Sequence, residues 1–135
     1  MSEATGDKAS RPLSPHLMHW RPHLTMVVSI SHRITGSAMY VGVLIIAGWA
    51  AALASGPDAF EQYRALLGSP LGKLVQIGLT FCVFFHLANG LRYLGWDLGK
   101  GFEKRTADTT ATAVVAFAAV MTILLWVIAG MRGLL

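Results

Sequence analysis

Three stretches of this sequence contain no aspartate, glutamate, lysine or arginine, and each approaches the length of a membrane span. They cover residues 34–54, 74–91 and 111–131. A helix needs about 20 apolar residues to cross a hydrocarbon core of roughly 30 Å. The second stretch reaches that length if it continues to Tyr93, with the Arg92 side chain extending toward the interface. We therefore predict an all-α integral membrane protein with three transmembrane helices, spanning about 29–54, 71–98 and 110–131.

The composition supports this class of protein. Charged residues make up 13% of the chain and hydrophobic residues 54%, whereas about a quarter of an ordinary soluble domain is charged. The net charge of +4 would suggest nucleic-acid binding in a soluble protein. Here the basic residues flank the apolar stretches, so membrane topology explains them better, and we expect membrane lipid but no nucleic acid as a partner.

The distribution of basic residues predicts the orientation in the membrane. The N-terminal side and the second loop each carry four lysines or arginines, whereas the first loop carries two, opposed by two acids. Because cytoplasmic segments are richer in lysine and arginine, we expect a cytoplasmic N-terminus and a periplasmic C-terminus in a bacterial inner membrane. A mitochondrial inner membrane is less favoured, since the first twenty residues contain Glu3 and Asp7 and are not rich in arginine.

The polar N-terminus is predicted to be an arm, residues 1–22, in front of one transmembrane domain, residues 23–135. Three prolines in this arm argue against a continuous helix. The arm and its boundary also hold His16, His19 and His23, but without a fixed scaffold we expect no metal site there. In the first loop, residues 60–67 are predicted to form a short helix at the membrane interface.

His86 lies inside the second apolar stretch, where an ionisable side chain is costly and therefore suggests a function. At about 100° per residue, His86 shares a helix face with Asn89, Gly90, Tyr93 and Asp97. Asp97 is eleven residues further on, about 16 Å along a helix, so His86 is placed near mid-membrane. Gly90 leaves room beside it for a flat, bulky group.

The first span carries a matching polar face with Ser29, His32, Arg33 and Gly36. By the predicted topology both faces lie on the cytoplasmic side and can meet. A neutral imidazole at His86 suits iron, and His32 and Arg33 could pair with propionates. A structural hydrogen bond from His86 to a neighbouring helix fits the periodicity equally well. For Arg92 we favour a simple interfacial anchor, and for Tyr40 and Tyr93 packing or interfacial roles.

The polar blocks together resemble one known family. They are Arg11-Pro-Leu-Ser-Pro-His16, Arg21-Pro, Ser29-Ile-Ser-His-Arg-Ile-Thr-Gly36, and His86 followed by Gly90-Leu-Arg92 and Asp97. This pattern resembles the cytochrome b subunit of succinate dehydrogenase, the larger membrane anchor of respiratory complex II. The match covers nearly the whole chain. Many family members have histidine where this chain has Tyr93.

The resemblance implies a fold and a set of partners. The chain would form half of a heterodimeric haem-binding bundle with a second, smaller membrane anchor subunit. It would also dock an iron–sulfur subunit and a flavoprotein subunit, which hold the iron–sulfur clusters and the flavin. On its own it would not be an enzyme.

The resemblance also implies residue roles. His86 would be an axial ligand of the iron of haem b, and His32 and Arg33 would bind the same cofactor. Ser29 and Arg33 would bind the quinone. No role follows for Asp97, His19 or His23. An anchor of a fumarate reductase is the nearest alternative, and a small oligomeric proton-coupled transporter is less favoured because no membrane-embedded carboxylate is present.

Overall fold

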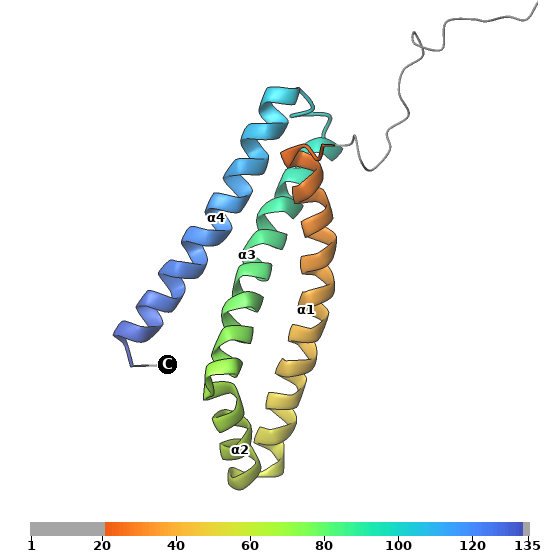
Figure 1. Ribbon diagram of the computed structural model, residues 1–135. Coiled ribbons are helices and arrows are strands. Elements are labelled where there is room, and N and C mark those ends of the chain that lie inside the picture. The colour runs from red at the N-terminus through yellow and green to blue at the C-terminus, as the bar shows by residue number, and fades with distance from the viewer. Residues whose placement is uncertain (1–20, 134–135) are drawn as a thin grey trace, which may run out of the picture.

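The computed structural model describes residues 21–133, and these form helices joined by short connections without any strand. In chain order the helices are α1 (Leu24–Ser55), α2 (Pro57–Gly68), α3 (Pro70–Asp97) and α4 (Lys104–Met131). Figure 1 shows α1, α3 and α4 as long rods and α2 as a short helix at one end. The predicted all-α class is confirmed, and the predicted arm lies almost wholly outside the described residues.

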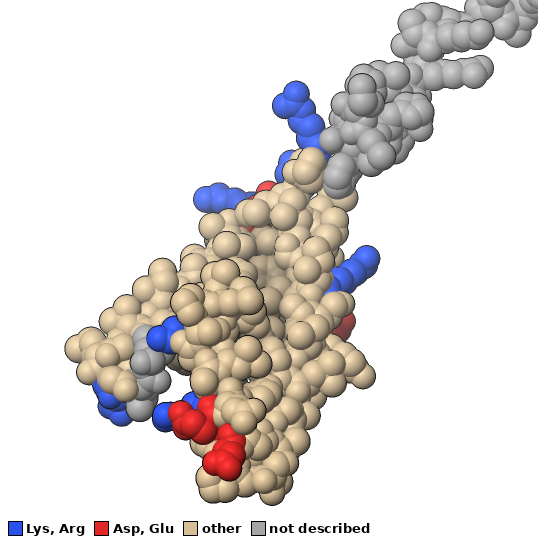
Figure 2. Space-filling view, turned by 60° about the horizontal axis from the view of Figure 1, so that its bottom comes forward, with Lys and Arg blue, Asp and Glu red and all other residues tan. Residues whose placement is uncertain are grey.

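Helices α1, α3 and α4 are each long and apolar enough to cross a membrane. They contain 32, 28 and 28 residues, which at 1.5 Å per residue exceeds a hydrocarbon core of roughly 30 Å. The chain is therefore a multi-pass membrane protein. In Figure 2 the acidic side chains at the α2 end lie beside basic ones, and uncharged residues cover most of the remaining surface.

The helices run alternately up and down. The start of α1 and the loop between α3 and α4 share one end of the molecule, and α2 and the end of α4 lie at the other (Figure 1). We call these the loop end and the α2 end. Helix α3 contacts both α1 and α4, whereas α4 leans away from α1 toward its C-terminus. This arrangement brings the two predicted polar faces of α1 and α3 to the same end.

Local signals explain where the helices begin and end. Gly56 has a φ of +114°, a conformation that suits glycine, and with Pro57 it separates α1 from α2. Ser69 caps α3 by accepting a hydrogen bond from the Gly72 amide at 3.1 Å, as expected for a serine N-cap. The predicted helix at 60–67 is confirmed and extends slightly at both ends.

The buried core is small and lies mainly where α3 meets α4. Its apolar members are Val28, Phe85, Ala111, Val114 and Ala118. The two alanines are completely buried, so they allow the α4 backbone to approach α3 closely. Large apolar side chains elsewhere on the long helices are exposed, which leaves them to face lipid or partner helices.

Candidate functional site

His86 projects from α3 against the face of α1. Its ring nitrogen Nδ1 lies 3.2 Å from the His32 carbonyl oxygen and 3.4 Å from the Thr35 hydroxyl. Thr35 donates its own hydroxyl hydrogen to that same carbonyl at 3.0 Å. Two acceptors therefore face Nδ1, so the geometry favours the tautomer in which Nδ1 carries the proton and donates it.

This tautomer leaves the second ring nitrogen of His86 as a lone-pair donor. Within residues 21–133, Nε2 makes no hydrogen bond. A histidine that binds a metal usually donates its other N–H to a carbonyl or carboxylate, which fixes the ring orientation and raises ligand basicity. The His32 carbonyl supplies that contact here. The arrangement can therefore present one oriented imidazole, with a ring nitrogen free, inside the membrane.

Gly36 makes room for this imidazole. A Cβ atom at Gly36 would lie 3.1 Å from His86 Cε1 and 3.6 Å from Nδ1, so a side chain there would press on the ring. Gly90, one turn beyond His86 on α3, has no such neighbour, because a Cβ built there meets nothing within 4 Å. The space next to Gly90 on this face of α3 is therefore open, as the spacing predicted.

His32 lies directly against His86. The two rings stack with centroids 3.8 Å apart and an interplanar angle of 13°. Tyr93 meets the His32 ring edge-on at 5.0 Å. The His32 Nδ1 atom is buried and has no hydrogen-bond partner among the described residues. A polar atom of this kind is costly unless a ligand or another group satisfies it.

Ser29 joins the same cluster through Tyr93, whose hydroxyl donates a hydrogen bond to the Ser29 hydroxyl at 3.0 Å. The interpretation of Tyr93 as a packing or interfacial residue is therefore incomplete, since its hydroxyl belongs to the site. Tyr40, by contrast, is 73% exposed. The structure thus brings Ser29, His32 and His86 together, and it adds Tyr93 and Thr35 to them.

Arg33 lies beside this cluster on α1 but faces outward. Its side chain is exposed and makes no hydrogen bond or ion pair within the described range. Asp97 is likewise exposed, at the end of α3. A guanidinium at the edge of the cluster is free to bind an anionic or carbonyl oxygen from outside the chain.

Arg92 is not the interfacial anchor that the sequence favoured. It is only 9% exposed and donates hydrogen bonds to the Thr110 hydroxyl at 3.0 Å and to the Ala107 carbonyl at 3.1 Å. It also reaches Asn89 Oδ1 at 3.3 Å, and its guanidinium carbon lies 4.0 Å from the centre of the Trp96 ring. Arg92 therefore joins α3 to α4 instead of extending into the interface.

Asn89 is also placed differently from the prediction. It is fully buried on the α4 side of α3, next to Arg92, and its Nδ2 has no partner among the described residues. The periodicity predicts Asn89 on the face of His86, because the two positions differ by only about 60° around the helix. The Arg92 side chain three residues later was the available signal for its true position.

The fold and the site define a class: a three-span membrane protein with an oriented imidazole in a polar cluster near one end of the bundle. The family model described as "Succinate dehydrogenase/Fumarate reductase transmembrane subunit" matches residues 7–125. The chain belongs to this family.

Individual relatives agree with the family match. The chain is 36% identical over 118 residues to the succinate dehydrogenase cytochrome b556 subunit of Paracoccus denitrificans, covering 87% of this chain and 91% of that one. It is 35% identical over 117 residues to the protein of the same name from Rickettsia conorii, with the same coverage. The mitochondrial cytochrome b560 subunit from Homo sapiens is 41% identical over 100 residues, covering 70% of this chain and 57% of the relative. The resemblance drawn from the polar blocks is confirmed.

Proposed function

We propose that this chain is the cytochrome b subunit that anchors a succinate dehydrogenase to the membrane, and that it binds haem b and contributes to quinone reduction. The observation that supports the proposal is the position of the His86 ring against α1. Its Nδ1 is held by the His32 carbonyl and the Thr35 hydroxyl, which leaves Nε2 for iron. Gly36, which has no side chain, lets the ring lie against α1 in this position.

The residues fit a haem. His86 would be the axial ligand, and the open space at Gly90 suits a flat macrocycle. His32, with its unpartnered Nδ1, and the free guanidinium of Arg33 would bind the propionates. When bound, the haem supplies a one-electron redox centre. By the resemblance to the family, we assign the other protein ligand of the iron to a partner anchor subunit.

Ser29 and Arg33 would bind the quinone. Tyr93 donates to the Ser29 oxygen, so the Ser29 hydrogen remains available to donate to a quinone carbonyl. Arg33 lies one helical turn further on and carries a positive charge. Two such donors aimed at one oxygen stabilise the negative charge that develops there during reduction. Electrons would come from flavin and iron–sulfur clusters in the flavoprotein and iron–sulfur subunits.

The proposed orientation in the membrane is supported by the position of the basic segments. The start of α1 and the basic loop between α3 and α4 lie at the same end (Figure 1), and this end carries Ser29 and Arg33. We place this loop end in the cytoplasm of a bacterium, with the C-terminus in the periplasm. The relatives' names favour succinate oxidation over the fumarate reductase alternative, and the family match favours an anchor over a transporter.

The quinone proposal is tested by replacing its two donors separately. Ser29→Ala and Arg33→Leu complexes should lose at least tenfold in succinate-to-quinone activity, while electron transfer to a soluble artificial acceptor stays unchanged. Ser55→Ala and Arg105→Leu are matched controls, because both residues are exposed and the Ser55 hydroxyl bonds only the Ala51 carbonyl, at the other end of α1. Near-normal quinone reduction in both test variants would show that these residues do not bind quinone.

A further inference from the structure

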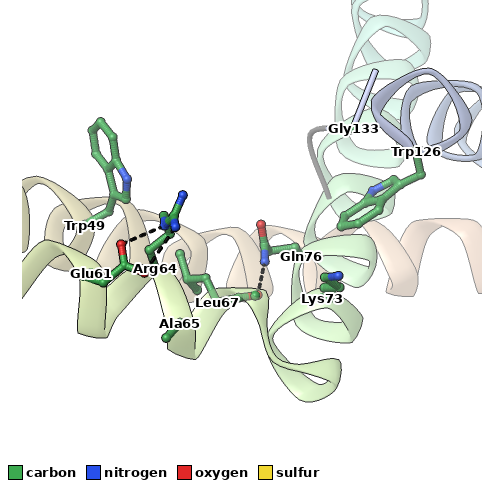
Figure 3. Close-up of a pocket in the computed structure, with 10 residues that line it drawn as sticks. Trp49, Glu61, Arg64, Ala65, Leu67, Lys73, Gln76, Trp126 and Gly133 are labelled. Atoms are coloured by element: carbon green, nitrogen blue, oxygen red, sulfur yellow. Dashed lines mark hydrogen bonds and ion pairs between the residues drawn. The ribbon is translucent and has the colours of Figure 1, made fainter. Parts of the chain in front are cut away.

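A second region of the molecule lies at the α2 end, away from His86. A cavity of about 590 Å³ opens there between α2, α3 and α4, lined by Glu61, Arg64, Lys73 and Trp126 among others. Figure 3 shows Arg64 of α2 on one side of the cavity and Lys73 of α3 with Trp126 of α4 on the other. We call this cavity the mouth.

The mouth continues into an apolar groove. The groove has a volume of about 740 Å³ and runs between α1, α3 and α4. It shares four residues with the mouth, which are Trp49, Leu67, Gln76 and Trp126, so the two spaces are continuous. From Trp49 the groove extends along α1 to Gly36, a distance of about 20 Å at 1.5 Å per residue. This exceeds the depth of one leaflet, about 15 Å or half of a hydrocarbon core of roughly 30 Å, so the groove is long enough for an acyl chain.

The charges at the mouth favour an anionic group. The Lys73 side chain makes no hydrogen bond or ion pair within residues 21–133. Arg64 pairs with Glu61 at 3.1 Å, but both side chains are more than 60% exposed, and exposed pairs of this kind contribute little. Arg64 can therefore turn toward a phosphate. Trp49 and Trp126 border the mouth, and tryptophans are enriched at the level of lipid headgroups.

The groove itself offers little polar recognition, because most of its polar side chains bond within the chain. The exception is the Tyr40 hydroxyl near the Gly36 end, which makes no hydrogen bond within residues 21–133. Gln76 Nε2 donates to the carbonyls of Leu67 and Gly72 at 2.7 and 3.2 Å. Trp126 Nε1 donates to the Thr80 hydroxyl at 3.3 Å, and Thr80 donates to the Gln76 carbonyl at 2.7 Å. A quinone ring needs donors for its carbonyls, whereas a hydrocarbon chain needs none.

We propose that this crevice binds an anionic phospholipid from the leaflet at the α2 end, with the phosphate held by Arg64 and Lys73 and an acyl chain in the groove. The chain would end against Gly36, which also contacts His86. The lipid would thereby fill the space between α1 and the outward-leaning α4. It would also support α1, which contacts the His86 ring through the His32 carbonyl and the Thr35 hydroxyl. This inference does not depend on the haem or quinone assignments.

Native mass spectrometry of the tagged complex in mild detergent tests whether the mouth binds the lipid headgroup. Phosphatidylglycerol is the added probe. In the Arg64→Glu/Lys73→Glu variant, retained phosphatidylglycerol should fall at least tenfold, and phosphatidylcholine should not replace it. Arg132→Glu is the control, since it reverses one charge at the same end at a residue that does not line the mouth. Its retained phosphatidylglycerol should stay within twofold of the unmodified complex, whereas Arg64→Glu and Lys73→Glu alone, which make the same charge change, should each lose more. Equal phosphatidylglycerol in all of these proteins would overturn the proposal.

A photoactivatable phosphatidylglycerol, with the reactive group in its acyl chain, tests the groove. It should label Val43, Ile46 or Leu79, which line the groove, and Ala129→Trp should abolish this labelling by filling the space. Uniform labelling of all lipid-facing residues would overturn the groove assignment. Release of bound quinone by Ala129→Trp, or crosslinking of a Val43→Cys variant to a partner helix, would assign the groove to another occupant and reject the lipid.

Discussion

Replacing Arg92 tests whether the polar contacts between α3 and α4 stabilise the bundle. In an Arg92→Leu variant the two hydrogen bonds to Thr110 and Ala107 on α4 are lost, together with the contact to the Trp96 ring. Hydrogen bonds between helices in a bilayer average about 0.6 kcal/mol each, and a cation–π contact of this kind contributes about 1 kcal/mol. The free energy of unfolding should fall accordingly.

The Asn89 amide adds to this cost. Its Oδ1 accepts from Arg92, and its Nδ2 already lacks a partner among the described residues. Removing Arg92 leaves both ends of a fully buried amide unpaired, a penalty of about 1 kcal/mol or more. Together these effects predict a loss of about 3 kcal/mol for Arg92→Leu. The additional replacement Asn89→Leu should restore about 1 kcal/mol, because no orphaned amide then remains.

Unfolding in mixed micelles by titration with dodecyl sulfate, followed by tryptophan fluorescence, measures these differences. Arg105→Leu is the control, because it removes an exposed arginine at the same end of the molecule and should cost less than about 0.5 kcal/mol. A loss below about 0.5 kcal/mol for Arg92→Leu would show that Arg92 acts as the freely extending anchor that the sequence favoured. It would refute the role assigned to its contacts with α4.

Two further substitutions examine the His86 cluster. Gly36→Ala places a methyl group 3.1 Å from His86 Cε1, so the haem content of assembled complexes should fall by at least half. The measurement is the pyridine haemochrome per complex. Full haem content would mean that the His86 ring has room to shift. Tyr93→Phe removes the hydroxyl that donates to Ser29, so the KM for quinone should rise about threefold or more, equivalent to about 0.7 kcal/mol or more. An unchanged KM in steady-state assays would separate Tyr93 from the quinone site.

The fold could be predicted from the sequence because few backbone conformations are stable inside a membrane. Backbone groups must be satisfied within the segment, so three long apolar stretches bounded by glycine, proline and charge could only become helices. The same periodicity placed Ser29, His32 and His86 on faces that meet. The short helix α2 was also predictable, since Pro57 and Gly68 lie at its two ends.

The contacts across helices were less predictable, because periodicity defines a face but not the neighbour that covers it. Arg92 was interpreted as an anchor since an arginine near a helix end often extends to the interface. Thr110 and Ala107, eighteen and fifteen residues away in sequence, give it partners that only the packing of α4 reveals. Thr35 was missed for the same reason, since its role depends on a histidine 51 residues away.

The central claim is that His86 binds haem iron through the nitrogen left free by its contacts to α1. A reduced-minus-oxidised visible spectrum of the purified complex tests it most directly. The wild-type complex and a His23→Ala control, altered at the exposed residue before α1, should show b-type bands. The bands should be lost or strongly shifted in an assembled His86→Ala complex. Unaltered b-type bands and full haem content in that variant would contradict the account.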